Sequence, residues 1–149
     1  MTADDYFAIQ NLIYSYCDRI DRGDFAGIGK LFAHADIHVP ALAEPVRGAA
    51  AVEAMYTQFT RIYPATGTPL TRHVTSNVMI EPDGEAAARA RSYVLVHQAT
   101  EALPLQPVIA GRYYDRFIRV AGEWRFSERR MEMDLFGDLS AHMLQPIPR

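Results

Sequence analysis

The chain has 149 residues, of which 49% are hydrophobic and 22% charged, as expected for one globular domain spanning residues 1–149. Its formal net charge is −3 and its arginines are spread among carboxylates, so the sequence predicts no nucleic-acid partner. Cys17 is the single cysteine, which excludes an internal disulfide. No apolar run reaches the roughly 20 residues of a membrane helix, and no basic, apolar leader opens the chain, so we expect a cytoplasmic protein that contacts no membrane.

The first part of the chain has the 3.6-residue period of amphipathic helices. Thr2 and Asp5 have the spacing of a capping box, and apolar residues at helical spacing continue to Ile20 before Gly23 offers a left-handed stop. Further helices are predicted over residues 24–32 and 49–63. Between these two, residues 36–48 are typical of two short strands joined by a loop that contains proline.

From residue 72 the period changes to two, which predicts strands over residues 72–81, 86–98, 108–120 and 124–134. In the last of these the apolar parity switches, so we expect a β-bulge near Arg129, and either Arg129 or Arg130 could face inward. Helices followed by long antiparallel strands predict an α+β fold, with three helices packed on the concave face of a curved, mainly antiparallel sheet. A cavity between these layers is the natural consequence.

Asp21 lies at the border of the apolar stripe of the first helix, beside Cys17, which we interpret as a buried small hydrophobe. It also lies at the C-terminal end of this helix, where the helix dipole disfavours a carboxylate. Two interpretations are open. Asp21 is either a solvated acid paired with Arg19 or Arg22, or an acid held in place by a partner that faces it.

His73 is the candidate partner, because it opens the first long strand. Strict alternation places His73, Thr75, Asn77 and Met79 on one face of this strand. Such a polar face is usually solvated. If it lines the cavity instead, it presents an imidazole and an amide to a ligand, and a carboxylate neighbour would orient the imidazole as a general base requires.

Several short motifs carry a resemblance to known proteins: Ile20-Asp21-Arg22-Gly23-Asp24, Arg72-His73 followed by Asn77, Gly111-Arg112-Tyr113 followed by Asp115, and Gly122 followed by Trp124-Arg125. In order and spacing they resemble the SnoaL-like families of the nuclear-transport-factor-like superfamily, over nearly the whole chain. The resemblance implies a cone-shaped α+β barrel around a pocket. Members include scytalone dehydratase, hexachlorocyclohexane dehydrochlorinase, bile-acid 7α-dehydratase and non-catalytic subunits of ring-hydroxylating dioxygenases.

The resemblance also implies roles for individual residues. Asp21 and His73 match the Asp–His pair of the dehydrochlorinase and the dehydratases. Tyr16 matches a tyrosine of the bile-acid dehydratase, and Arg119 matches a pocket arginine of the dehydrochlorinase. Residues 133–142 resemble the closing segment of the dehydrochlorinase.

Other candidates come from single residues. Tyr56 and Tyr93 are expected to be core aromatics, with the alternative that they donate to a ligand oxygen. Arg130 is a candidate ligand contact if it, rather than Arg129, points inward.

Metal and cofactor sites are not expected. His34, Asp36 and His38 alternate like metal ligands, but their segment is typical of an exposed strand start and nothing completes the set. The sequence has no glycine-rich phosphate loop and no Cys/His cluster.

These observations predict a cofactor-independent lyase or isomerase acting on a small, largely apolar or cyclic molecule. His73 would move a proton, Asp21 would orient it, and Tyr16 and Arg119 would assist as electrophiles. Two alternatives stay open, a binding domain without turnover and a structural subunit of an oxygenase. We also expect a homo-oligomer, dimer or trimer, because a sheet of this kind leaves an apolar convex face uncovered.

Overall fold

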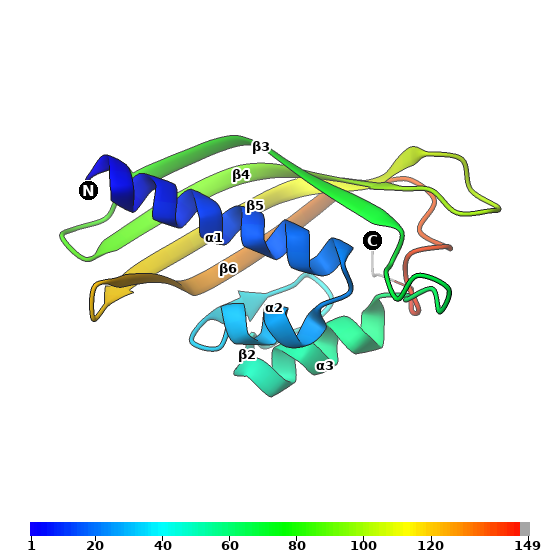
Figure 1. Ribbon diagram of the computed structural model, residues 1–149, viewed down its shortest axis with the longest axis horizontal. Helices are drawn as coiled ribbons and strands as arrows, with labels where there is room; N and C mark the ends of the chain where they lie inside the picture. Colours follow the sequence, from blue (N-terminus) through cyan, green and yellow to red (C-terminus); the bar gives the residue numbers. More distant parts are fainter. Residues whose placement is uncertain (147–149) are drawn as a thin grey trace.

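The computed structural model describes residues 1–146, in which three helices lie on one side of a six-stranded sheet (Figure 1). The helices are α1 (Ala3–Asp21), α2 (Phe25–Leu31) and α3 (Ala49–Phe59). The strands are β1 (Asp36–His38), β2 (Val46–Arg47), β3 (Thr71–Pro82), β4 (Ala87–Gln98), β5 (Gln106–Val120) and β6 (Glu123–Phe136). The predicted α+β class is confirmed. Within residues 1–146, no helix is both long and apolar enough to cross a membrane.

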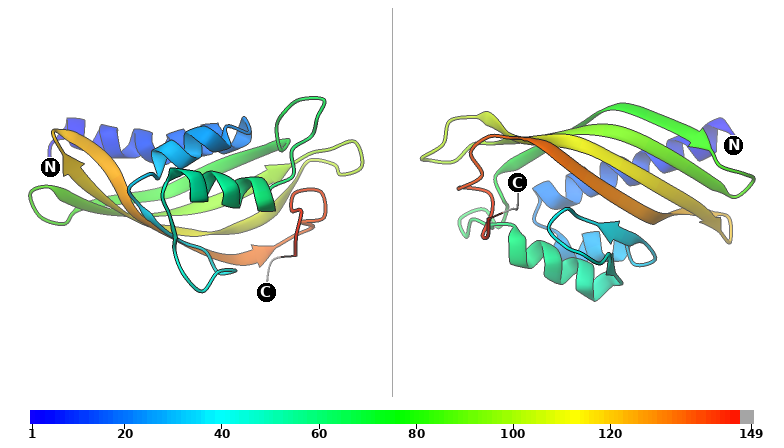
Figure 2. Two further views of the ribbon diagram at one scale, coloured as in Figure 1. Left: turned by 90° about the horizontal axis from the view of Figure 1, so that it is seen from below. Right: turned by 180° about the vertical axis from the view of Figure 1, so that it is seen from behind.

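The sheet has the strand order β2-β1-β6-β5-β4-β3. β1 pairs in parallel with β6, whereas the other neighbouring strands are antiparallel. The sheet curves around the helices, which cover its concave face (Figure 2). It stays open, with β2 and β3 at its two edges, so the expected cone is present without closing into a hydrogen-bonded barrel.

α1 begins as the sequence predicts. The Thr2 hydroxyl accepts a hydrogen bond from the Asp5 backbone N–H at 3.2 Å, and the Asp5 carboxylate accepts one from the Thr2 N–H at 2.8 Å. This capping box satisfies two N–H groups that a helix start leaves unpaired. The buried face of α1, including Ile9 and Ile13, packs into the core under the sheet, so the helix axis runs along the concave face.

The turn after α1 requires a glycine. Gly23 has a φ of +73°, and a Cβ added there would lie 2.5 Å from the carbonyl oxygen of Gly67. The loop before β3 therefore presses directly against the C-terminal end of α1. This contact brings the start of β3 next to Asp21.

α3 is shorter than predicted, because the chain beyond Phe59 bonds to other segments. Thr60 has an extended backbone with φ −101° and ψ 125°, and it forms a β-bridge with Met143. The Arg61 N–H donates to the carbonyl oxygen of His142 at 2.9 Å. Residues 60 and 61 thus pair with the C-terminal segment, and Tyr63 bridges to Thr68, instead of continuing the helix.

The expected bulge in the last strand is confirmed. Phe117 of β5 pairs with Phe126, whereas the preceding Arg116 pairs with Glu128, so β6 carries one extra residue at Ser127. The extra residue reverses the alternation of side chains. As a result Arg129 points into the core and Arg130 is exposed.

Candidate functional site

Asp21 and His73 form a shielded pair under the sheet. The His73 Nδ1 lies 2.7 Å from Asp21 Oδ1, and the two side chains are 5% and 13% exposed. A nitrogen this close to a carboxylate carries the proton and donates it, which leaves Nε2 as the free acceptor of the ring. His73 lines a cavity, while Asp21 lies behind it.

Two further donors hold the Asp21 carboxylate. The Thr71 hydroxyl donates to Oδ1 and the His73 backbone N–H donates to Oδ2, each at 2.8 Å. Burial acts to raise the pKa of Asp21, but the hydrogen bonds and charge of His73, together with the Thr71 hydroxyl, bring that pKa below its ordinary value. Asp21 therefore stays ionised at a helix C-terminus, where the dipole opposes it.

The alternative interpretation of Asp21, a solvated acid paired with a neighbouring arginine, does not describe the structure. Arg19 pairs with Asp24 at 2.7 Å, and Arg22 pairs with Asp18 at 3.0 Å. Both arginines thus already have partners. The partner of Asp21 is the histidine of β3.

The cavity has a volume of about 160 Å³ and lies between α1, α3 and the concave face of the sheet. Its polar side chains within the described chain belong to Tyr16, Tyr56, Thr60, His73, Tyr113 and His142. The rest of its wall is apolar and comes from Ile20, Val39, Pro40, Ala41, Met55, Phe59, Val96, Ile109, Met131, Met133, Phe136 and Met143. An apolar cavity with a few convergent polar groups is the usual form of a small-molecule site.

Three tyrosines form a connected group on the cavity wall. The Tyr56 hydroxyl donates to the Tyr16 hydroxyl at 3.2 Å, and the Tyr16 ring meets the Tyr113 ring edge-on, with 5.8 Å between ring centres. The Tyr16 ring also meets the His73 ring edge-on, with 6.0 Å between ring centres. Burial raises the pKa of each of these three tyrosines, so all three hydroxyls keep their protons and can donate.

Arg129 packs against the rings of two of these tyrosines, Tyr16 and Tyr113. It is fully buried and forms two 2.8 Å hydrogen bonds to the Asp115 carboxylate. Its guanidinium carbon lies 4.1 Å from the centre of the Tyr113 ring and 4.5 Å from that of Tyr16. This positive charge opposes the effect of burial on the pKa of both tyrosines. Arg129 therefore supplies the positive charge beside the tyrosines. Arg130 lies on the exposed side of the strand, where it pairs with Glu128 at 3.7 Å.

Asn77 does not reach the cavity, so its predicted position is wrong. The register of β3 shifts between Ser76 and Met79, and Asn77 has a φ of +52° and is exposed. Alternation thus holds from His73 to Thr75 and then reverses, so that Val78 turns toward the core.

Arg119 is also far from the cavity. It pairs with Asp5 at 3.2 Å, in the first turn of α1, whereas Asp21 ends the same helix. At 1.5 Å per residue these two acids are separated by roughly 24 Å. The expected pocket role of Arg119 does not fit this position.

Tyr93 lies on the opposite face of the sheet from the cavity. Its neighbours Ser92 and Val94 are buried, so alternation turns Tyr93 outward, where Arg112 lies 5.3 Å from its ring centre. Tyr16 and Tyr56, by contrast, line the cavity as candidate ligand contacts.

The structure adds Tyr113 and His142 to the site, and of the two candidate arginines it is Arg129 that points inward. Tyr113 follows the glycine and arginine of a recognised motif, which marked the strand but not the direction of the ring. His142 lies beyond every predicted element, so periodicity offered no signal for it. Among residues 1–146 no group of three ligating side chains could hold a metal, and Asp36 instead binds Arg47 at 2.9 Å.

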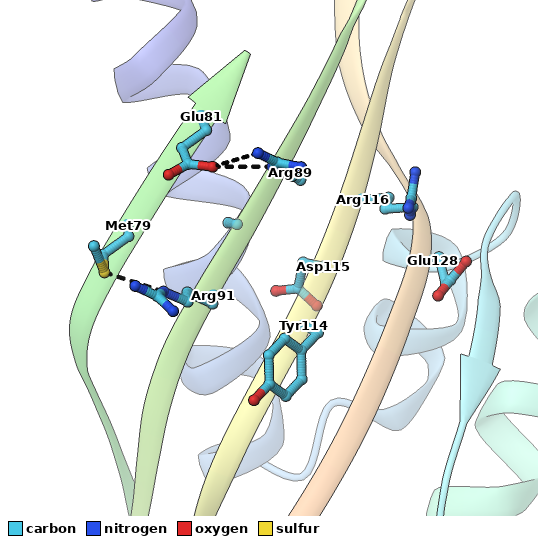
Figure 3. A pocket seen from close by; sticks show the side chains of 9 residues that line it. Met79, Glu81, Arg89, Arg91, Tyr114, Asp115, Arg116 and Glu128 are labelled. Carbon is cyan, nitrogen blue, oxygen red and sulfur yellow. Dashed lines mark hydrogen bonds and ion pairs between the residues drawn. The ribbon is translucent and has the colours of Figure 1, made fainter. Parts of the chain in front are cut away.

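A wider hollow of about 400 Å³ lies on the convex face of the sheet (Figure 3). Its charged side chains bond to their neighbours, as Arg89 does to Glu81 at 2.9 Å and as Arg91 does to the Met79 sulfur at 3.2 Å. The hollow is separated from Asp21 and His73 by the sheet. The concave cavity is therefore the candidate site.

Comparison with known proteins agrees with this architecture. A family model described as a SnoaL-like domain matches residues 1–130. No curated protein matches the chain. A solved protein of unknown function from Mycobacterium tuberculosis is 27% identical with a TM-score of 0.72, over 89% of this chain and 78% of that one.

Two structures from Novosphingobium aromaticivorans share the fold. One, named as a candidate scytalone dehydratase, is 24% identical with a TM-score of 0.70, over 90% of this chain and 87% of that one. The other, an NTF2-like protein with a cystatin-like fold, is 21% identical with a TM-score of 0.72, over 93% and 86% of the two chains. With its family model covering most of the sequence, the chain belongs to the SnoaL-like domain family and has the NTF2-like, cystatin-like fold.

Proposed function

We propose that this protein is a cofactor-independent lyase or isomerase in which His73 removes a proton from a carbon atom of a small, largely apolar ligand. The observation that carries the proposal is the 2.7 Å contact between His73 Nδ1 and Asp21 on the wall of an apolar cavity. The contact fixes the tautomer and direction of the imidazole, and the cavity keeps bulk water from competing for the proton.

The proton and electrons balance without a further reagent. Nε2 of His73 accepts the proton from carbon, and Asp21 stabilises the imidazolium that forms. The electron pair of the broken C–H bond either forms a double bond as a leaving group departs, or moves onto a conjugated oxygen. In the lyase the proton leaves with the departing group, and in the isomerase His73 returns it to another carbon.

Tyr113 is the proposed donor to the ligand oxygen that gains charge. Tyr113 lines the cavity, and its ring packs edge-on against Tyr16, whose hydroxyl accepts the hydrogen bond from Tyr56. The Arg129 guanidinium lies beside the Tyr113 ring and is fixed by its carboxylate partner. A donor held in this way, where charge develops, favours the transition state over the bound substrate.

The walls of the cavity indicate the class of substrate. Met55, Met131, Met133 and Met143 line it together with aliphatic and aromatic side chains. Thioether side chains are polarisable and adapt to rings of different shape. With a volume of about 160 Å³, the cavity suits a compact alicyclic or aromatic molecule.

Proton exchange tests the proposal without knowledge of the natural substrate. We would incubate the protein with small cyclic ketones, such as cyclohexanone and 2-tetralone, in D₂O and follow loss of the α-proton signals by NMR. We expect the protein to accelerate exchange and His73→Gln to abolish the acceleration. His34→Gln, at an exposed position, is the matched control and should exchange like the unchanged protein.

A binding domain without turnover is the rival proposal. It predicts that the same ketones bind to the protein and to His73→Gln with equal affinity, and that neither exchanges their protons. That result would replace the lyase or isomerase with a carrier of small apolar molecules.

A further inference from the structure

The chain after β6 turns back over the cavity and is fastened there by hydrogen bonds. The carbonyl oxygen of Ala141 accepts from the Tyr63 hydroxyl at 2.7 Å and from the Gln98 side chain at 3.1 Å. Leu144 N–H donates to the Phe59 carbonyl oxygen at 2.9 Å. These contacts surround His142 on both sides and hold its backbone in place.

The His142 side chain forms part of the cavity wall, as does that of His73. It is 6% exposed, and its Nδ1 is sealed from solvent with no hydrogen-bond partner in the described part of the chain. Leaving such an atom unpaired costs about 1–3 kcal/mol, so a buried orphan of this kind calls for an explanation. Thr71 and the His73 backbone satisfy Asp21, but nothing comparable serves His142.

The charge state of His142 determines which hydrogen-bonding groups of a ligand it can bind. Burial and the nearby His73 lower the pKa of His142 to about 4, while Asp21 acts in the opposite direction. Its imidazole is therefore neutral at neutral pH, with one nitrogen that donates and one that accepts. A half-turn about the Cβ–Cγ bond exchanges the nitrogen and carbon positions of the ring, so it can present either edge to the cavity.

We propose that His142 is a second ligand-binding imidazole, which holds a hydroxyl or carbonyl oxygen of the molecule that His73 acts on. The proposal rests on the proposed function of the cavity and specifies its substrate class, a compact ring compound that bears an oxygen substituent. A neutral imidazole suits a hydroxyl group, which also both donates and accepts. Most of the cavity wall, including the neighbouring Met143, is apolar, so few groups compete with His142 for that oxygen.

Direct binding of a matched pair of probes tests this inference. 2-Naphthol and 2-methylnaphthalene have the same ring system, but only the first has a hydroxyl group. Fluorescence titration should show that the unchanged protein prefers 2-naphthol. His142→Phe should weaken 2-naphthol binding about tenfold, as expected for one lost hydrogen bond, and should not weaken 2-methylnaphthalene binding.

Two further measurements keep the test independent of folding and of turnover. In the unchanged protein labelled with ¹⁵N, 2-naphthol should shift the ring-nitrogen resonances of His142, and 2-methylnaphthalene should shift them less. His142→Gln, which keeps a hydrogen-bonding side chain, should retain part of the preference. An unaltered preference in His142→Phe, or one lost only in His73→Gln, would overturn the assignment of His142.

The two proposals can fail separately. If His73→Gln and the unchanged protein show the same hydroxyl preference and neither exchanges ketone protons, the lyase or isomerase proposal fails and His142 remains a binding group. If His73 supports exchange while His142→Phe binds both probes like the unchanged protein, only the inference about His142 fails.

Discussion

His73 contacts both oxygens of the Asp21 carboxylate, with its ring Nδ1 2.7 Å from Oδ1 and its backbone N–H 2.8 Å from Oδ2. The first contact fixes the ring and the second fixes the strand that carries it. Because Asp21 ends α1 and His73 lies at the start of β3, the pair also joins the helix layer to the edge of the sheet. Orientation of the imidazole and docking of the helix are thus parts of one arrangement.

Asp21→Asn should release the His73 ring from its single tautomer. The amide can present either its oxygen or its NH₂ group to Nδ1, and it no longer stabilises an imidazolium. Two-dimensional ¹⁵N–¹H NMR should show a mixture of ring tautomers, and ketone exchange should fall by at least ~100-fold. Asp18→Asn, an exposed acid on the same helix, should change neither quantity. A His73 tautomer unaffected by Asp21→Asn would contradict the coupling.

Thr71→Val should destabilise the fold through the Asp21 carboxylate. The buried hydroxyl donates to Oδ1 at 2.8 Å, and valine keeps its shape without the donor. We expect the free energy of unfolding in urea to fall by about 1–2 kcal/mol. Thr57→Val is the control, because its hydroxyl bonds only to a backbone carbonyl on the exposed side of α3. An equal effect of the two substitutions would show that Asp21 does not depend on Thr71.

Arg129→Met should be among the most damaging single changes in the core. It leaves the Asp115 carboxylate buried without the guanidinium that now binds it through two hydrogen bonds. Breaking such a buried pair costs about 3–5 kcal/mol, measured by urea unfolding. The double variant with Asp115→Leu should recover much of the loss, while Arg130→Met, on the exposed side, should be nearly neutral. A double variant as unstable as Arg129→Met would show that the damage is loss of packing and not of charge pairing.

Acid should destabilise the folded protein in two separate windows. Burial depresses the pKa of His142 from 6.5 to about 4. Between pH 6.5 and pH 4, His142 is therefore protonated in the unfolded chain but not in the folded protein. Stability should therefore fall as the pH drops from about 6.5 to 4, by up to about 3 kcal/mol. The pKa of Asp21 is also depressed, so its carboxylate stabilises the folded protein above about pH 3.8. This stabilisation is lost as the pH falls below that value and the carboxylate gains a proton.

Substitution separates the first window from the second. Urea unfolding of His142→Gln should lose the pH dependence between 6.5 and 4, whereas His34→Gln, at an exposed position, should keep it. An unchanged slope in His142→Gln would place the acid sensitivity elsewhere.

A second copy of the chain is the expected partner of the convex face. Met79, Tyr93, Tyr114 and Ile118 are exposed there, and Met79 and Tyr114 line the hollow of Figure 3. Two such faces would bury apolar surface from both copies. We expect sedimentation velocity to show a dimer or trimer at micromolar concentration, and Tyr114→Glu to shift it to monomer. If the unchanged protein sediments as a monomer, the prediction that the convex face binds a second copy is wrong.

The sequence by itself determined the elements and their order, because helical and strand periods are local properties. Three such local signals agree with the structure: the capping box of Thr2, the helix stop at Gly23 and the change of apolar parity before Arg129. Each depends only on residues that are close together in the sequence. The juxtaposition of Asp21 with His73 was predictable only together with the family resemblance, since no local pattern relates residues this far apart.

Only the tertiary structure decided which side chains face the cavity. The left-handed backbone at Asn77 reverses the alternation of β3, although the apolar residues of this strand show no change of parity in the sequence. Arg119, which the resemblance placed in the pocket, lies at the end of β5 that meets Asp5. His142 lies in a segment without periodicity, and its place depends on hydrogen bonds to Phe59, Tyr63 and Gln98. Strand register, bulges and the docking of irregular segments depend on contacts between residues that are distant in the sequence. These contacts form only when the chain is packed, so no local sequence pattern predicts them.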